Sequence, residues 1–180
     1  MRVKEKLNKL FGRLTGYRLY HKKMWRRVHM IRANARRLIY FTRHFEQIRG
    51  IPGAVVECGV YQGRSLLLLA YLAEEENRNV YGFDSFSGFK ELYHQHFKHT
   101  SEQLARWILK KGDCRANVKI ISGYFKDTLQ HFREPISLLH IDADLYDSHM
   151  TIFKYLYPLV QKGGVILFDE YKDPEDLKHW

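Results

Sequence analysis

Cysteine is scarce in this sequence, and long apolar runs are missing from it. Its two cysteines, Cys58 and Cys114, form neither a close pair nor a Cys/His metal motif, which excludes a disulfide framework and a zinc finger. No apolar stretch is long enough to span a membrane, and the N-terminus lacks the apolar core of a signal peptide. These absences predict a cytoplasmic protein with reduced thiols.

Acidic residues are nearly absent from the first 49 positions. This segment holds 15 Lys/Arg against two acids, Glu5 and Glu46, and therefore carries a net charge of +13. Residues 50–180 hold 15 Lys/Arg against 18 Asp/Glu, a net charge of −3, so the first segment accounts for the whole basic excess of +10. We therefore expect a basic N-terminal arm or lid, residues 1–49, followed by a nearly neutral domain, residues 50–180.

The basic arm is predicted to be helical. Residues 4–15 and 19–48 lack proline, and their apolar residues recur at intervals of three and four. We favour two helices docked on the main domain with a solvated basic face, which also steers an anionic substrate. A lid over a nucleotide sugar and contact with an anionic membrane surface stay open. We expect no nucleic-acid partner, because no base-binding Asn-Pro-Pro-Tyr motif is present.

Strands and helices are expected to alternate after the Gly/Pro-rich turn at residues 49–53. The expected strands are residues 54–60, 79–83, 118–122, 136–141 and 165–168, and the expected helices are residues 65–76, 101–111, 125–132 and 148–160. Short apolar strands separated by helices predict an α/β, Rossmann-like fold with a five-stranded parallel sheet and helices on both faces.

Acidic residues end four of the five expected strands. They are Glu57, Asp84, Asp142 with Asp144, and Asp169 with Glu170. The carboxyl ends of parallel strands meet at one edge of the sheet, and ligands of such sheets bind there. The sequence therefore predicts a binding site at this edge.

The first two strand ends favour an adenosine-type cofactor. After the first strand, Gly59 and Gly63 allow the backbone to approach a ligand, although their spacing differs from the dinucleotide motif G-x-G-x-x-G. Asp84 ends the second strand, where a carboxylate can accept hydrogen bonds from ribose hydroxyl groups.

The last two strand ends favour a divalent cation. Carboxylates that converge without a cation repel and raise one another's pKa, whereas Mg²⁺ or Ca²⁺ prefers such oxygen ligands. The alternative is that Asp142 faces the cofactor while the other acids are solvated.

Four segments together resemble the macrocin O-methyltransferase family of class I S-adenosylmethionine-dependent methyltransferases. They are VVECGVYQGRS, VYGFDSFSGF, ISGYFKDTL and IDADLYDSHMTIFKYLYPLVQKGGVILFDEY, and they fall within residues 50–172. The resemblance implies methylation of a sugar hydroxyl on a nucleotide sugar or glycosylated natural product. A class I sheet has two more strands, so we expect a C-terminally truncated member whose methyltransferase domain is incomplete.

The resemblance also assigns roles to residues. The S-adenosylmethionine site would comprise Glu57, Gly59, Tyr61, Gly63, Ser65, Asp84, Ser85, Phe86, Gly123, Tyr124, Phe125 and Asp142. Mg²⁺ would bind Asp142, Asp169 and Glu170, the last at a position where the family usually has Asp. Asp144 would be the general base that deprotonates a sugar hydroxyl made more acidic by the ion.

Two other interpretations stay open. The chain could be a cephalosporin-hydroxylase-like relative with the same sheet and acidic edge, or a cofactor-binding fragment without turnover. The expected partner is a small-molecule sugar, and a homo-oligomer stays open as well.

Overall fold

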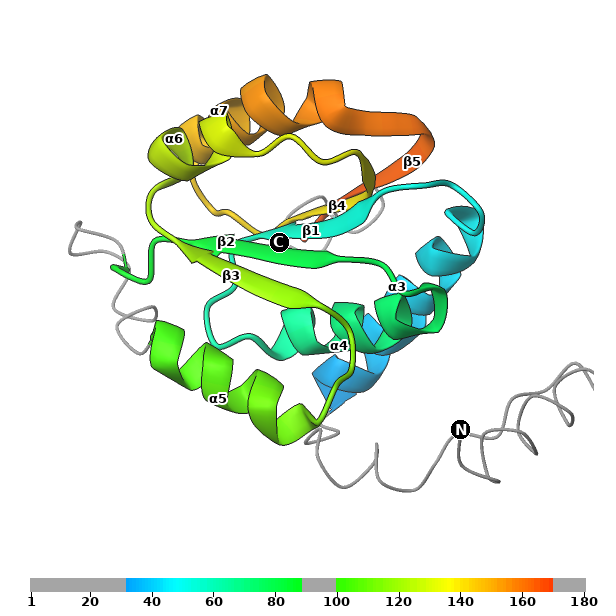
Figure 1. The fold of residues 1–180 in the computed structure, drawn as a ribbon. Helices are drawn as coiled ribbons and strands as arrows, with labels where there is room; N and C mark the ends of the chain where they lie inside the picture. The colour runs from blue at the N-terminus through cyan, green and yellow to red at the C-terminus, as the bar shows by residue number, and fades with distance from the viewer. Residues whose placement is uncertain (1–31, 89–99, 170–180) are drawn as a thin grey trace, which may run out of the picture.

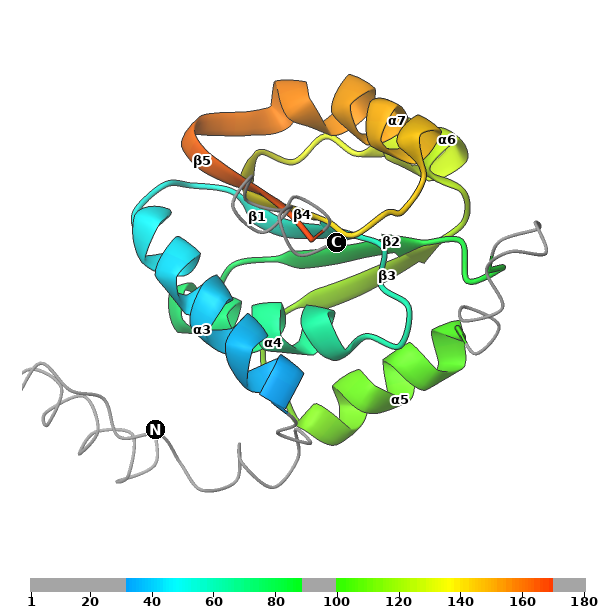
Figure 2. The same cartoon turned by 180° about the vertical axis from the view of Figure 1, so that it is seen from behind.

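A computed structural model describes residues 32–88 and 100–169, which form a three-layer α/β fold (Figures 1 and 2). The central sheet is parallel and has the strand order β3-β2-β1-β4-β5. The strands are β1 (Ala54–Cys58), β2 (Val80–Asp84), β3 (Val118–Ser122), β4 (Ile136–Ile141) and β5 (Val160–Phe168). This topology confirms the predicted fold class and brings the carboxyl ends of all five strands to one edge.

Helices cover both faces of the sheet (Figures 1 and 2). One face carries α3 (Arg32–Gln47), α4 (Arg64–Ala73) and α5 (Glu102–Gly112), and the other carries α6 (Phe125–Thr128) and α7 (Tyr146–Leu156). Short 3-10 helices continue α4, α6 and α7, at Glu74–Glu76, Leu129–His131 and Tyr157–Leu159. Successive side chains of β1 point to opposite faces, so Val55 packs in the core under α3 and α4 and Val56 in the core under α7.

Helix α3 belongs to the same core as the sheet, although it comes from the basic arm. Phe41, Phe45 and Ile48 lie on one stripe of the helix, at intervals of four and three, and all three are buried. The division of the chain at residue 49 therefore follows charge and not packing for the described part of the arm. The helix predicted over residues 4–15 lies outside the described residues.

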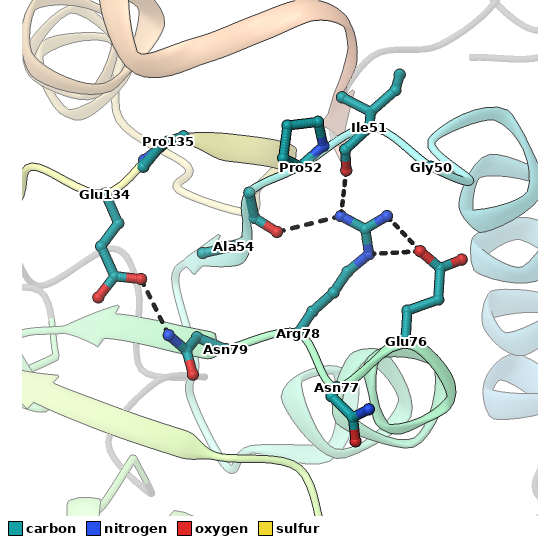
Figure 3. Close-up of a pocket in the computed structure, with 11 residues that line it drawn as sticks. Gly50, Ile51, Pro52, Ala54, Glu76, Asn77, Arg78, Asn79, Glu134 and Pro135 are labelled. Atoms are coloured by element: carbon teal, nitrogen blue, oxygen red, sulfur yellow. Dashed lines mark hydrogen bonds and ion pairs between the residues drawn. The ribbon is translucent and has the colours of Figure 1, made fainter.

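A hollow of about 440 Å³ at the amino ends of the strands surrounds Arg78 (Figure 3). All five guanidinium N–H donors of Arg78 are engaged, by the carbonyl oxygens of Ile48, Ile51 and Gly53 and by the carboxylate of Glu76. Because no N–H donor of Arg78 remains for a ligand, its role is structural: it connects the end of α3 to the start of β2.

The boundary between the last helix and strand differs from the expectation. The sequence predicts a helix to residue 160 and a strand from 165, but α7 ends at Leu156 and β5 begins at Val160. Pro158 lacks a backbone N–H and therefore cannot continue the α-helix. Gly163, with φ of +84°, lies where β5 shifts register against β4. Gly163 and Gly164 therefore belong to an irregular part of strand β5, whereas the sequence predicted a turn before the strand.

No helix within residues 32–88 and 100–169 is both long and apolar enough to cross a membrane.

Candidate functional site at the carboxyl edge

Asp84 ties two loops together at the ends of β1 and β2. Its Oδ2 accepts the backbone N–H groups of Val60 and Tyr61, both at 2.7 Å, and its Oδ1 accepts that of Phe86 at 2.7 Å. A carboxylate offers about four acceptor sites, so about one remains, on Oδ1. In this loop conformation Asp84 can accept one further hydroxyl group, and Ser85 lies next to it in the chain.

The loop from β1 to α4 is shaped by close backbone contact. A Cβ at Gly59, whose φ is +97°, would lie 1.8 Å from the carbonyl oxygen of Asp142, so no side chain fits there. Gly63 is the N-cap of α4 in a left-handed conformation, and Tyr61 adopts a φ of +51°. Ser65 is buried in the first turn of α4. The loop is therefore held in one conformation, with a non-glycine residue at positive φ of the kind that gathers at ligand sites.

The end of β3 joins the same cluster. The backbone N–H of Gly123 donates to the Asp84 carbonyl at 2.9 Å, and the Ser87 hydroxyl donates to the Tyr124 hydroxyl at 3.3 Å. Tyr124 is exposed, and Phe125, which begins α6, packs against the core. The predicted cofactor residues on these three strands thus lie in neighbouring loops.

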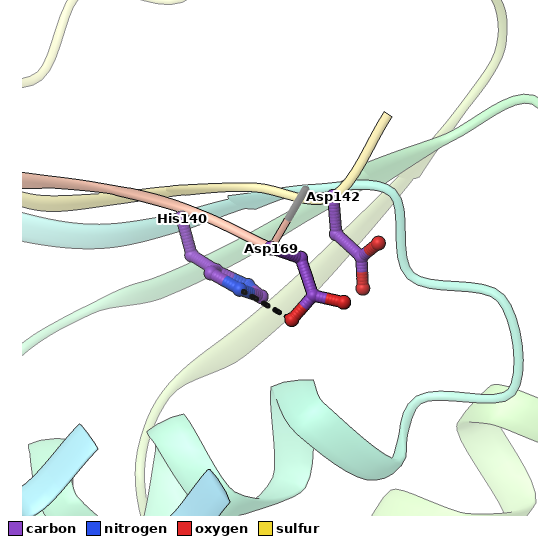
Figure 4. A group of neighbouring side chains, drawn as sticks. All are labelled: His140, Asp142 and Asp169. Atoms are coloured by element: carbon purple, nitrogen blue, oxygen red, sulfur yellow. Dashed lines mark ion pairs between the residues drawn. The ribbon is translucent and has the colours of Figure 1, made fainter. Parts of the chain in front are cut away.

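A second cluster lies at the ends of β4 and β5 (Figure 4). His140, Asp142 and Asp169 each offer one ligand atom, and these atoms lie within 4.8 Å of one another. Burial, with further contributions from Asp169 and Glu57, raises the pKa of Asp142 to about 7. An acid in this setting favours either a proton or a cation.

Glu57 and His140 form a buried pair behind these acids. Glu57 is 0% exposed and His140 is 1% exposed, and Oε1 lies 3.0 Å from Nδ1. In the neutral form of His140, Nδ1–H donates to the Glu57 carboxylate and Nε2, which lies 3.9 Å from Oδ1 of Asp169, is an acceptor that can bind a metal ion, whereas a protonated His140 would form ion pairs with both acids. Two acceptors that face each other, backed by a carboxylate–histidine pair, are typical of a metal site. The donor set therefore fits a divalent cation.

Arg37 of α3 also contacts these acids. Its Nη2 lies 2.9 Å from Oδ2 of Asp169 and 3.8 Å from Oδ2 of Asp142. We expected the basic face of the arm to be solvated. Arg37 departs from that expectation, because its guanidinium forms ion pairs with two acids at the sheet edge.

The sequence profile of the family described as macrocin O-methyltransferase (TylF) matches residues 21–179, which is most of the chain. The chain belongs to this family. The resemblance inferred from its motifs is thereby confirmed.

Individual relatives of known name match a shorter stretch. Demethyldecarbamoylnovobiocin O-methyltransferase of Streptomyces niveus is 29% identical over 140 residues, 67% of this chain and 53% of that protein. Mycinamicin III 3''-O-methyltransferase of Micromonospora griseorubida is 27% identical over 148 residues, 69% of this chain and 58% of that protein. The chain thus spans about half the length of these relatives.

Solved structures agree with the fold. The O-methyltransferase NovP superposes with a TM-score of 0.66 at 28% identity, covering 75% of this chain and 64% of that one. The calicheamicin methyltransferase CalS11 superposes with a TM-score of 0.70 at 19% identity, covering 97% and 81% of the two chains, and shows the fold alone.

In this macrocin O-methyltransferase family member, one predicted cofactor residue, Glu57, has a different partner from the one expected. We expected Glu57 beside Asp84 at the cofactor, but its described contact is with His140, on the side of Asp142 and Asp169. Its place in the cofactor pocket stays a prediction.

Two further predicted residues keep the roles assigned to them as predictions. Asp144 is exposed in the loop between β4 and α7, and its role as general base stays a prediction. Glu170, the third expected metal ligand, lies outside the described residues.

Sequence reasoning missed Arg37 and His140, and each left a signal. His140 precedes Asp142 by two residues, so both side chains point to the same face of the sheet. Arg37 precedes the buried Phe41 by four residues, so it lies one turn along the same face of α3.

Proposed function

We propose that this protein is an S-adenosylmethionine-dependent O-methyltransferase that methylates a sugar hydroxyl of a nucleotide sugar or glycosylated natural product. The observation that carries the proposal is the family match over residues 21–179, which includes every strand end of the acidic edge. A further relative, from Streptomyces olivaceus and 28% identical over 141 residues, is by its name a 4'-O-methyltransferase of a tetracenomycin that bears a dimethoxy-rhamnosyl group.

The cofactor half of the site is proposed at the ends of β1, β2 and β3. Asp84 would accept one ribose hydroxyl through the free acceptor site of Oδ1, while its other sites hold the loop that contains Tyr61. The exposed ring of Tyr124 would lie beside the adenine. S-adenosylmethionine supplies an electrophilic methyl group, and the protein supplies its alignment.

The acceptor half is proposed at the ends of β4 and β5. Asp142 and Asp169 would hold Mg²⁺, with Glu170 as a third ligand and His140 as a nitrogen donor or as support behind them. A bound divalent cation lowers the pKa of a hydroxyl group that it chelates. Asp144, which is exposed two residues after Asp142 in the chain, would then accept the hydroxyl proton as general base.

Calorimetry with S-adenosylhomocysteine tests the cofactor half. Asp84→Asn removes one carboxylate oxygen that serves both the loop and the ribose, and we expect about tenfold or greater loss of affinity, the worth of a hydrogen bond to a charged group. Asp113→Asn is the matched control, because Asp113 caps α5 at the opposite edge of the sheet and should leave the affinity unchanged. A wild-type chain that binds no S-adenosylhomocysteine would refute the proposal.

A further inference from the structure

We propose that Arg37 is a built-in counter-ion of the acidic cluster, which competes with the divalent cation for Asp142 and Asp169. This inference rests on the cation site of the proposed function. Its starting point is geometric, because Nη2 of Arg37 lies 2.9 Å from Asp169 and 3.8 Å from Asp142. The two carboxylates therefore already share a positive charge that comes from another element of the fold.

The packing of α3 on the sheet places Arg37 beside Asp142 and Asp169. One turn further along α3, Phe41 is fully buried and packs edge-on against the His140 ring, with ring centroids 5.0 Å apart. At the far end, the Ile48 carbonyl accepts a hydrogen bond from Arg78 at 2.9 Å. The helix is thus anchored at two points on the sheet, and position 37 falls over the carboxyl edge.

Anchoring of the helix still leaves the guanidinium able to move. The Arg37 side chain is 37% exposed, and its described ion-pair contacts are the two acids, so it can turn into solvent without breaking the packing of α3. Arg37 can therefore neutralise the acids when no metal ion is bound and release them when one arrives.

The charges oppose simultaneous binding. A divalent ion would lie about 2.0–2.6 Å from the same carboxylates, since these are the usual ligand distances of Mg²⁺ and Ca²⁺. Asp169 offers Oδ1 toward His140 while Oδ2 faces Arg37, so one oxygen of this carboxylate is already occupied by the guanidinium. If Arg37 stays, the two cations repel each other, and if Arg37 leaves, its ion pair is lost. Either way, Arg37 weakens the binding of the metal ion.

Removing the charge tests the inference. Arg37→Gln keeps a good helix former at the position and abolishes the ion pair. We expect the affinity for Mg²⁺ or Mn²⁺, measured by calorimetry on the whole chain, to rise about two- to fivefold, the range for a partly exposed ion pair. Arg36→Gln, on the same helix and exposed, should leave the affinity unchanged. Arg37→Lys keeps a positive charge and should bind the ion less tightly than Arg37→Gln.

Thermal unfolding in a chelator gives a second readout that needs no metal ion. Arg37→Gln should lower the melting temperature of the metal-free protein, and saturating Mn²⁺ should remove that difference from the wild type. An Arg37→Gln protein that binds the ion no more tightly than the Arg36→Gln protein would overturn the inference while leaving the metal site intact. If neither the wild type nor any variant binds Mg²⁺ or Mn²⁺, the metal site is refuted as well. Calorimetry with S-adenosylhomocysteine then tests the cofactor half of the proposed function separately.

Discussion

At the scale of single residues, Gly59 is the described glycine at which an added Cβ would make the shortest contact. We predict that Gly59→Ala lowers the free energy of unfolding by about 2–4 kcal/mol, since the new Cβ would collide with the Asp142 carbonyl oxygen at a positive φ. Gly50→Ala is the control, because Gly50 also has a positive φ, +76°, but no atom lies within 4 Å of its added Cβ. Urea unfolding of both variants measures the difference, and equal losses would contradict the steric explanation.

The sequence predicts the position of a residue at the sheet edge well where the strand itself places it. Asp84, Asp142 and Asp169 follow directly from the position of strand ends, because parallel strands deliver their last residues to one edge. Arg37 and Glu57 depend on partners more than 80 residues away, Asp169 and His140, and such pairing is fixed only when helices and strands pack. A local pattern can indicate the face on which such a residue lies, but it does not identify the distant partner.

At the scale of elements, α3 shows how a charged segment can be part of a core. We predict that Phe41→Ala lowers the free energy of unfolding by about 3–5 kcal/mol, because its side chain is fully buried against the sheet. Ile39→Ala, two residues earlier and 59% exposed, should change it by less than about 0.5 kcal/mol. Chemical denaturation compares the two. A small effect at both positions would mean that α3 is a detachable arm.

Element types were predictable and one boundary was not. Apolar runs of four to seven residues between helical patterns predicted all five strands, and β3 and β4 were predicted with their observed bounds. The start of β5 was missed because the sequence around Gly163 and Gly164 is typical of a turn, whereas the structure uses it to shift register within a strand. A bulge and a turn use the same residues, so only pairing with β4 distinguishes them.

At the scale of the whole molecule, the acidic edge makes the free energy of unfolding depend on pH. In the folded protein the pKa of Asp142 is about 7, against an ordinary value of 3.8. Between these values the folded state binds more protons than the unfolded state, so the stability contributed by this group is present at low pH and is lost as pH rises through 7. The edge is therefore least stable at a pH where the acids are ready to bind a cation.

We predict that the free energy of unfolding of the wild type, measured by urea denaturation in a chelator, falls between pH 5 and pH 8 by about 1–3 kcal/mol more than that of Asp142→Asn. The difference between the two proteins reports the titration of Asp142 together with its coupling to Asp169, Glu57 and His140. Asp144→Asn, which removes an exposed acid two residues away, should behave as the wild type. Saturating Mg²⁺ at pH 8 should restore the stability of the wild type and leave Asp142→Asn nearly unchanged, because the ion would replace the proton that the buried carboxyl lacks at that pH. A wild type whose pH dependence equals that of Asp142→Asn would show that Asp142 ionises as freely in the folded protein as in the unfolded chain.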